Sequence, residues 1–530
     1  MATMTPAPAA SVQEPAEQVT PQSTNSSHGQ ILKSSALVGG SQILNIVISM
    51  IRTKAIALLL GPSGFGLFGI YTSIVNLGQT IAGLGINSSG VRQIAAAVSL
   101  GEEATIAETA LVLRRVAILL GLLGAALMVL FSRQISQLTF ASPDHASDIA
   151  WLSIAVFLTL ISASQTALIQ GMRRIADLAK LQVLGAIFAT LFSIPLVYFF
   201  HQQGIVASLI CVAAMTIAAS WWYAHKISFR NSLMPAMSNA RMRQEVSALL
   251  KLGVAFMTSS LITLGVAYGV RVMVLRRIGF EATGLYQSAW TLGGLYVGFI
   301  LQAMGADFYP RLTASAHDDA ECNRLVNEQA QVGILLAGPG VIASISLAPL
   351  VINLFYSSKF GAAVGVLRWI CLGTMLQVIS WPMGFVIVAK ARRALFIGCE
   401  VAWGLVSIAL ALLCVLYFGL AGAGIASFGS YVFHGLMLYV IVSRMTHFRW
   451  SRENQITGLI SLSLLAIVFC GFYLLPLVYS VILGIAATTF HAVYSMRVLT
   501  SFIAVDRIPS PIRKVFRRLR LISENNTGLV

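Results

Sequence analysis

Residues 34–60 read SSALVGGSQILNIVISMIRTKAIALLL, a stretch of 27 residues in which Arg52 and Lys54 are the only charges. About 20 apolar residues in a helix cross the ~30 Å hydrocarbon core of a bilayer. Comparable runs follow along most of the 530-residue chain. One such run is also typical of a buried helix in a soluble protein, but more than a dozen in series are not. The sequence therefore predicts an all-α polytopic membrane protein.

Composition supports this class and excludes several others. Mean hydropathy is +0.82 and 10% of residues are charged, against about 25% in soluble globular domains. The net charge of +16 comes from arginines and lysines between apolar runs, so it predicts orientation in a membrane rather than binding to nucleic acid. Five of the six cysteines fall inside apolar runs and no CxxC or Cys/His cluster occurs. We therefore expect neither disulfides nor a metal site.

The apolar runs divide into about fourteen predicted transmembrane helices, and an even number places both termini on one side. With the N-terminus in the cytoplasm, 27 of the 35 lysines and arginines fall in cytoplasmic loops and tails and 8 fall outside. This split follows the positive-inside rule. The predicted spans cover residues 35–60, 68–86, 116–131, 149–169, 181–200, 204–224, 252–275, 283–304, 332–356, 363–388, 394–418, 421–442, 456–475 and 477–496.

An internal repeat relates the two halves of the chain. At an offset of 219 residues, Arg52 pairs with Arg271, Arg92 with Arg311, and 173–174 with 392–393. Residues 66–68 (Gly-Leu-Phe) match 284–286 (Gly-Leu-Tyr) when one loop residue is dropped. Six spans per repeat make the halves parallel bundles related by an axis along the membrane normal, a form known in carriers that work by alternating access.

The repeat and the change of composition along the chain divide it into six parts. The first tail is rich in Pro, Ala, Ser, Thr and Gln, and we expect it to be disordered. The last tail contains PIRKVFRRLRLI at 511–522, which is a basic amphipathic helix on anionic membrane lipids or a plain positive tail. The predicted parts are a disordered cytoplasmic tail at 1–30, a six-helix bundle at 31–226, a linker at 227–246, a second six-helix bundle at 247–445, two C-terminal helices at 456–496 and a basic tail at 497–530.

A polar stripe follows one face of the first span. Gln42, Asn45, Ser49 and Arg52 recur at steps of three, four and three residues, with Lys54 on a neighbouring face. A charge at this depth costs several kcal/mol in lipid, so Arg52 is expected to face a wet cavity or a partner. The alternative is that these cations extend to the membrane interface.

Two further pairs of charges follow from the repeat. Arg271 in the seventh span is equivalent to Arg52, and two cations facing one cleft would attract an anion such as a pyrophosphate. Lys180 is equivalent to a position beside Glu400, so one hypothesis is that these two side chains face each other and help to close a cytoplasmic gate. The alternatives are that Glu400 pairs within its own half and that Lys180 flanks its helix.

The chain resembles the Wzx-type O-antigen and polysaccharide translocases of the multidrug/oligosaccharidyl-lipid/polysaccharide exporter superfamily. The resemblance rests on ILKSSALVGGSQILNIVISMIRTKAIALLLGPSGFGLFGIY at 31–71, GLYQSAWTLGGLYVGFILQAMGADFYPRLTA at 284–314 and AKARRALFIGCEV at 389–401. It implies two six-helix bundles in a V around a cationic cavity, in the bacterial inner membrane. It also implies flipping of undecaprenyl-pyrophosphate-linked oligosaccharide to the periplasmic leaflet, with the cavity charges at Arg52 and Arg271.

Two other functions remain as alternatives. A multidrug exporter of the same superfamily needs carboxylates to bind cationic drugs, and the spans offer little beyond Glu400. A membrane enzyme of polysaccharide assembly needs a sizeable outer loop, and the predicted outer loops are short. No GxxxxGK[ST] motif occurs, so we expect no bound cofactor, and H⁺ or Na⁺ is the candidate coupling ion. A polysaccharide polymerase is a candidate protein partner.

Overall fold

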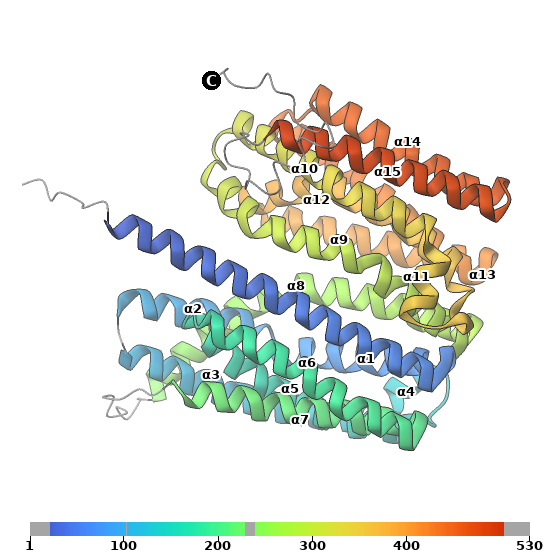
Figure 1. Ribbon diagram of the computed structural model, residues 1–530. Helices are drawn as coiled ribbons and strands as arrows, with labels where there is room; N and C mark the ends of the chain where they lie inside the picture. The colour runs from blue at the N-terminus through green and yellow to red at the C-terminus, as the bar shows by residue number, and fades with distance from the viewer. Residues whose placement is uncertain (1–21, 102, 228–238, 503–530) are drawn as a thin grey trace, which may run out of the picture.

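The computed structural model describes residues 22–101, 103–227 and 239–502, and every regular element within these ranges is a helix (Figure 1). The elements, in chain order, are α1 (Gln22–Gly83), α2 (Ile86–Leu100), α3 (Glu103–Leu130), α4 (Ser132–Phe140), α5 (Ala146–Gly171), α6 (Ile175–Phe200), η1 (His201–Gln203), α7 (Gly204–His225), α8 (Asn239–Ile278), α9 (Phe280–Ala314), α10 (Asp319–Ser346), α11 (Ala348–Phe355), η2 (Ser358–Phe360), α12 (Ala363–Ala389), α13 (Arg393–Thr446), α14 (Arg452–Leu474) and α15 (Leu477–Ser501).

Within the described residues, ten helical segments are long and apolar enough to cross a membrane, or eleven if the bent α9 counts as one span. Three of the ten contain 44, 51 and 54 residues, which at about 1.5 Å per residue is at least twice the thickness of the hydrocarbon core. Each of the three is interrupted near its middle. The chain is therefore an all-helical, multi-pass membrane protein, as predicted.

The interruption in α1 is sharper than the sequence suggested. Residues 61–67 were predicted as a loop, but only Gly61, at φ 64°, leaves the helical conformation. Pro62 follows at once, and proline suits the first turn of the helix that resumes there. Gly419, at φ 57°, breaks α13 in the same way. Since positive φ is costly for residues with a Cβ, each glycine permits a reversal without a loop.

Helical structure also extends beyond the predicted spans. Leu84 and Gly85 have φ of 46° and 69°, and this left-handed pair separates α1 from the unpredicted α2. Likewise, α3 begins at Glu103 rather than near Val116. The first helix, α1, begins at Gln22, within the segment 1–30 that the composition predicts to be a disordered tail. The basic segment 511–522 lies outside the described residues.

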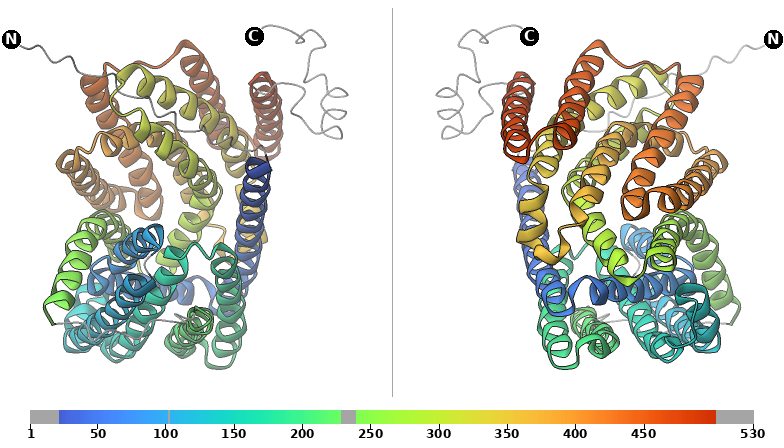
Figure 2. Two further views of the ribbon diagram at one scale, coloured as in Figure 1. Left: turned by 90° about the vertical axis from the view of Figure 1, so that its left-hand side faces the viewer. Right: turned by 90° about the vertical axis from the view of Figure 1, so that its right-hand side faces the viewer.

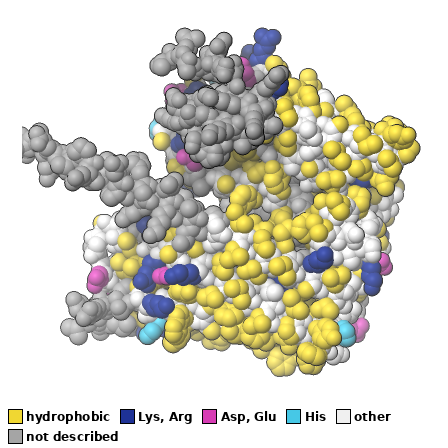
Figure 3. All heavy atoms as spheres, in the orientation of Figure 1, with side chains coloured by type: hydrophobic (Ala, Val, Ile, Leu, Met, Phe, Trp, Pro, Cys, Tyr) yellow, Lys and Arg dark blue, Asp and Glu magenta, His cyan; other side chains and the backbone are white. Residues whose placement is uncertain are grey.

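The helices form two lobes, shown one above the other in Figures 1 and 2. The N-terminal lobe contains α1 to α7, and the C-terminal lobe contains α8 to α13 with α14 and α15 on its outer side. The break in α1, the break in α13 and the junction of α8 with α9 lie at one end of the helices, on the right in Figure 1, here called the kink face, and the opposite end is the tail face. Hydrophobic side chains cover the middle of the side seen in Figure 3, and most charges gather toward the helix ends.

The long helix α8 packs on both lobes. In its first half, Leu249 is fully buried in a cluster with Ile94 and Leu113 of the N-terminal lobe. In its second half, Val266 lies against Gly404 of α13, where a Cβ on the glycine would come within 3.0 Å of it. The lobes are therefore joined by one continuous helix as well as by their contact surfaces.

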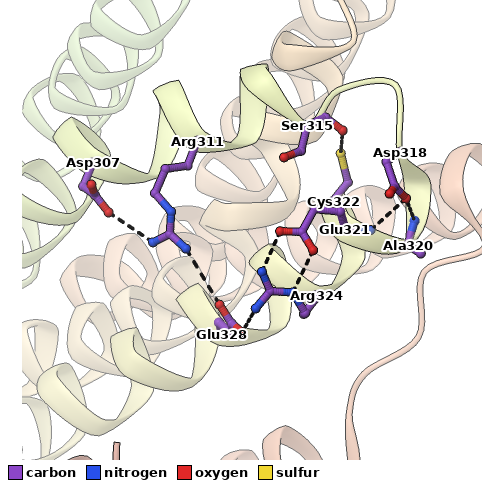
Figure 4. A network of polar contacts seen from close by, with 9 residues as sticks. All are labelled: Asp307, Arg311, Ser315, Asp318, Ala320, Glu321, Cys322, Arg324 and Glu328. Atoms are coloured by element: carbon purple, nitrogen blue, oxygen red, sulfur yellow. Dashed lines mark hydrogen bonds and ion pairs between the residues drawn. The ribbon is translucent and has the colours of Figure 1, made fainter. Parts of the chain in front are cut away.

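An ion-pair network joins α9 and α10 at the tail face (Figure 4). Arg324 donates from Nε and Nη2 to both carboxylate oxygens of Glu321, at 2.7 and 2.6 Å, and also bonds Glu328. Arg311 of α9 bridges Asp307, at 3.2 Å, and Glu328, at 4.0 Å. Exposed pairs contribute little singly, so the network mainly fixes the helix ends.

The last two helices pack on α10 through small residues and one histidine. His491 of α15 is fully buried, and its Nε2 and Nδ1 lie 2.6 Å from the Ser461 hydroxyl and 3.1 Å from the Ser495 hydroxyl. A Cβ on Gly338 of α10 would come within 2.3 Å of the His491 ring. This close approach seats the α14–α15 hairpin on the C-terminal lobe.

We expect the substitution Gly338→Leu to displace this hairpin, because the new side chain would occupy the space of the His491 ring. Overpacking of this kind costs about 1–3 kcal/mol. Thermal unfolding in detergent should show a lower midpoint, and limited proteolysis between α13 and α14 should become faster. Gly458→Leu is the matched control, because Gly458 of α14 has no atom in reach of a new Cβ. Equal stability of the two variants would contradict this account of the docking.

Candidate functional site

Two glycines near the kink face bring the backbones of the two lobes into contact. A Cβ on Gly66 of α1 would lie 2.4 Å from the Phe280 carbonyl oxygen, and one on Gly284 of α9 would lie 1.8 Å from the Pro62 carbonyl oxygen. These glycines begin the two Gly-Leu-aromatic segments that the repeat pairs with each other. The repeated segments thus form this contact between the two halves, which the sequence pairing alone did not predict. A second backbone contact joins Gly85 to Gly253 of α8, where a Cβ on Gly85 would lie 2.0 Å from the Gly253 carbonyl oxygen.

Three hydrogen bonds between the lobes surround this contact. Lys54 donates from Nζ to the Leu354 carbonyl at the end of α11, at 2.7 Å. The Tyr268 and Thr139 hydroxyls lie 2.5 Å apart, and Arg276 donates to the Gln137 carbonyl. Lys54, expected in the cationic cavity, is therefore bound to α11 in this structure.

An aromatic cluster closes the same face. The Phe65 ring of α1 has its centroid 5.4 Å from that of Tyr356 and 5.9 Å from that of Phe360, both in edge-to-face geometry. All three side chains are buried. The kink face is therefore held shut by apolar packing and hydrogen bonds together.

Below this closed face, two members of the polar stripe of α1, Asn45 and Ser49, line a cavity between the lobes. The cavity has a volume of about 260 Å³, and Asn45, Ser49 and Thr53 face Thr291 across it. The Ser49 hydroxyl donates to Asn45 Oδ1 at 3.2 Å. Gln42, the first member of the stripe, is half-buried. Asn45 and Ser49 of the predicted stripe thus face α9 of the other lobe across this cavity, whereas Gln42 and Arg52 are not part of its lining.

Arg271 connects to the same cavity through two side chains. Its Nε donates to Gln287 Oε1 at 2.5 Å, and its Nη1 donates to the Ala267 carbonyl at 2.9 Å. Gln287 Nε2 in turn donates to the Thr291 hydroxyl at 3.3 Å. Gln287 also lies against α1, within 3.1 Å of a Cβ position on Gly69. Arg271 is therefore fixed at the interface of the lobes by neutral partners.

Arg52 has no such partner. Its side chain is half-buried, and among the described residues no protein group accepts a hydrogen bond from it. The ion pairs within the described ranges lie near the ends of the helices, and none includes Arg52, Lys54 or Arg271. A cation in a membrane normally faces a cavity or a counter-ion. Neither of the two repeat-related arginines is therefore paired with a carboxylate of the described residues.

A second cavity between the lobes lies toward the tail face. It has a volume of about 310 Å³, and its polar lining includes Asn76 and Gln79 of α1, Asn87 of α2 and Ser260 of α8. Together with the first cavity, it places polar groups at two depths of the interface.

The predicted gate pair is not formed in this structure. Lys180 is exposed near the start of α6, and Glu400 is half-buried near the start of α13. No ion pair joins them within the described part of the chain. A gate role for these residues stays a prediction about another conformation.

Sequence reasoning missed Gln287 and the aromatic side chains around Arg271. Tyr286 and Trp290 of α9, with Trp403 and Tyr431 of α13, line a further cavity inside the C-terminal lobe. The available signal was the run of small residues at four-residue steps that faces them, such as Ser407 and Ala411. No group of His, Cys, Asp and Glu suited to a metal ion occurs in the ranges that the structure covers.

Comparison with known proteins places the chain in a family. A family model described as "Polysaccharide biosynthesis protein" matches residues 55–365, which is more than half of the 530 residues. The chain belongs to this family. Among relatives of this polysaccharide biosynthesis protein, the lipid III flippases of Escherichia coli (strain K12) and Shigella flexneri are each 23% identical over 386 residues, covering 70% of this chain and 88% of each relative.

Solved structures show the fold of this family member. The lipid II flippase MurJ, in an inward closed conformation, has a TM-score of 0.63 at 15% identity and covers 88% of this chain and 99% of its own. An inward-facing multidrug resistance MATE family transporter of the MOP superfamily has a TM-score of 0.62 at 15% identity, covering 76% and 98%. The fold is thus that of MATE transporters and MurJ. The proteins that this chain resembles are flippases and transporters rather than enzymes, which confirms the predicted class.

The glycine contact leads to a test of the closed kink face. We expect Gly284→Ala to separate the lobes there, because its Cβ would overlap the Pro62 carbonyl. In a background with the six native cysteines replaced, Thr139→Cys with Tyr268→Cys should be joined by a short bis-maleimide, and Gly284→Ala should lower the yield several-fold. Gly265→Ala, on α8 with nothing in reach of its Cβ, is the control. An unchanged yield in Gly284→Ala would show that this contact does not hold the face shut.

Proposed function

We propose that the protein flips undecaprenyl-pyrophosphate-linked oligosaccharide, an O-antigen or exopolysaccharide repeat unit, from the cytoplasmic to the periplasmic leaflet. One observation carries the proposal. Two repeat-related arginines lie at membrane depth on facing lobes, and no carboxylate among the described residues neutralises Arg52 or Arg271. A pyrophosphate supplies the missing negative charge, and arginine binds phosphate oxygens through paired N–H donors. The lipid III flippases among the relatives support a lipid-linked cargo.

The proposal includes a Wzx-type topology of fourteen spans with both termini in the cytoplasm. Each of the three interrupted segments crosses the membrane twice, the other seven segments cross once, and the bent α9 adds one more crossing, which gives fourteen. The kink face is then periplasmic and the tail face cytoplasmic, in the inner membrane. The charge asymmetry of the loops supports this orientation.

Alternating access explains how the site transports such a cargo. The contact at Gly66 and Gly284 and the three hydrogen bonds around it close the periplasmic side, while the polar cavities lie nearer the cytoplasm. Cargo would enter between the lobes, bind the two arginines and leave once the lobes separate at the kink face. Lys180 and Glu400 could then meet and close the cytoplasmic side. H⁺ or Na⁺ remains the candidate coupling ion, and a polysaccharide polymerase the candidate protein partner.

Substituting the arginines tests the proposal. Arg52→Ala and Arg271→Ala should each lower flipping at least tenfold, because a hydrogen bond to a charged group contributes about 1.5–3 kcal/mol. Flipping is measured as the fraction of undecaprenyl-linked oligosaccharide in the outer leaflet of a deletion strain that carries each variant. Arg277→Ala, an exposed arginine two turns beyond Arg271, should keep at least half of the wild-type rate.

Two results would contradict the proposal. Normal glycan export in the deletion strain would exclude a flippase for this cargo, and a simultaneous gain in drug sensitivity would favour the multidrug exporter. Full export by both arginine variants, at wild-type protein levels, would leave the cationic site without a role.

The orientation predicts which loops react with reagents from outside. In a cysteine-free background, Pro143→Cys on the kink face should be labelled by a membrane-impermeant maleimide in spheroplasts. His317→Cys on the tail face should be labelled only after permeabilisation. Both positions are exposed. The reverse pattern would invert the topology and the direction of transport.

A further inference from the structure

The C-terminal lobe contains a cavity that the arginine site does not account for. This lobe cavity has a volume of about 260 Å³ and lies among α8, α9, α12 and α13. Single waters need only about 10–15 Å³, and small-molecule pockets begin near about 300 Å³. The lobe cavity is therefore of a size for one ring-sized group. Four aromatic rings and six polar side chains line it, the latter being Thr263, Thr374, Gln377, Ser407, Ser427 and Ser430.

Two hydrogen-bond donors in the wall of this cavity have no protein partner. The Trp403 indole N–H and the Ser427 hydroxyl are buried, and neither bonds to any described residue. Ser427 is only 9% exposed. A buried donor left unpaired costs about 1–3 kcal/mol, whereas a ligand that accepts hydrogen bonds removes this cost. An isoprenoid chain has no acceptors, so the wall favours a polar ligand with apolar faces.

Arg271 lies at the edge of the same cavity. Its side chain folds back along α8 to the Ala267 carbonyl, and Ala267 and Val270 both line the cavity. Tyr286, another lining residue, directly precedes Gln287, which accepts a hydrogen bond from Arg271 Nε at 2.5 Å. A group covalently attached to a phosphate on Arg271 could therefore reach into the lobe cavity.

The repeat shows that this space is particular to one lobe. At the offset of 219 residues, Ser407 and Ala411 of the lobe cavity correspond to Phe188 and Phe192 of α6. The C-terminal lobe thus carries two small residues where the N-terminal lobe carries two phenyl rings. The same comparison places Trp403 opposite a leucine, Leu184, and Tyr431 opposite a valine, Val212, so these two rings have no aromatic counterpart in the N-terminal lobe.

We propose that the lobe cavity binds a neutral sugar ring of the cargo, the one attached to the phosphate held by Arg271. The C–H faces of a pyranose stack on the Trp403 and Tyr431 rings, and its hydroxyls accept from Trp403 and Ser427. This inference rests on the proposed function and deepens it. It assigns recognition of the first sugar to the C-terminal lobe, while the arginines bind the part of the cargo that all lipid-linked sugars share.

The test introduces into the lobe cavity the phenyl ring that the N-terminal lobe carries at the equivalent position. Ala411→Phe copies Phe192 and should lower flipping at least tenfold, whereas Leu412→Phe, whose side chain is exposed on the outside of α13, should stay within twofold of wild type. The wild-type protein in the same assay tests the proposed function separately: absence of flipping by wild type would contradict the flippase itself. If wild type and Ala411→Phe both flip the cargo equally well, the sugar site is excluded and the flippase is not.

Binding to the purified protein in nanodiscs separates the possible occupants. Titration followed by tryptophan fluorescence should give dissociation constants for hexose 1-phosphates (the glucose, galactose and N-acetylglucosamine derivatives) at least tenfold lower than for inorganic phosphate. Ala411→Phe should abolish this preference and leave the binding of inorganic phosphate unchanged. Trp403→Phe should weaken the binding of the sugar phosphates about three- to tenfold. Hexose phosphates that bind no better than phosphate would overturn the proposal. Tighter binding of citronellyl diphosphate, blocked by Ala411→Phe, would overturn it in favour of an isoprenoid site.

Discussion

Backbone contact between the two lobes at Gly66 and Gly284 is the constraint on which the arrangement of the site depends. With Cβ positions 1.8–2.4 Å from carbonyl oxygens of the facing helix, only glycine permits this approach. Lipid provides little hydrophobic drive for helices to associate, so close backbone packing is a main source of stability in a membrane. The contact in turn sets the positions of α1 and α9, and hence of Asn45, Thr291 and the Arg271–Gln287 pair between them.

Within the described part of the chain, charged side chains are paired with opposite charges at the ends of the helices and unpaired inside the interface of the lobes. The ion pairs of Arg311, Arg324 and Lys390 lie at the tail face, where water reduces their cost and their contribution alike. Arg271 instead has neutral partners, which orient the guanidinium without cancelling its charge. Arg52 keeps its charge without a protein acceptor among the described residues. The interior of the interface therefore combines a hydrogen-bonded cation with one that has no protein acceptor among the described residues, which is what the proposed anionic cargo requires.

The equivalence of Arg52 and Arg271 stays a prediction, whereas hydropathy and spacing correctly predicted the helical class and the common face of Asn45 and Ser49. They succeed because period and length follow directly from helix geometry. They failed at 61–67, where a single glycine with positive φ replaces a loop, and at α2, whose short amphipathic pattern lacks the length of a span. Lys54 was expected in the cavity because it is a cation within a span. Its hydrogen bond to the Leu354 carbonyl joins residues 300 positions apart, and spacing within one helix does not predict such a contact. The lobe cavity likewise arises from small residues on α13 facing rings on α9, which no single segment reveals.

One helix belongs to both lobes, and this limits how they move. The 40 residues of α8 form a rod of about 60 Å, with Leu249 buried in one lobe and Val266 packed on the other. Two bodies fixed to a single stiff rod cannot rotate independently. Either the rod flexes between Leu249 and Val266, or its first half detaches from α2 and α3. The elasticity of nearly five turns of helix thus enters the energy of every transport cycle, and a sequence change at an outward-facing position there, such as the exposed Val254, would alter the rate of turnover without touching cargo.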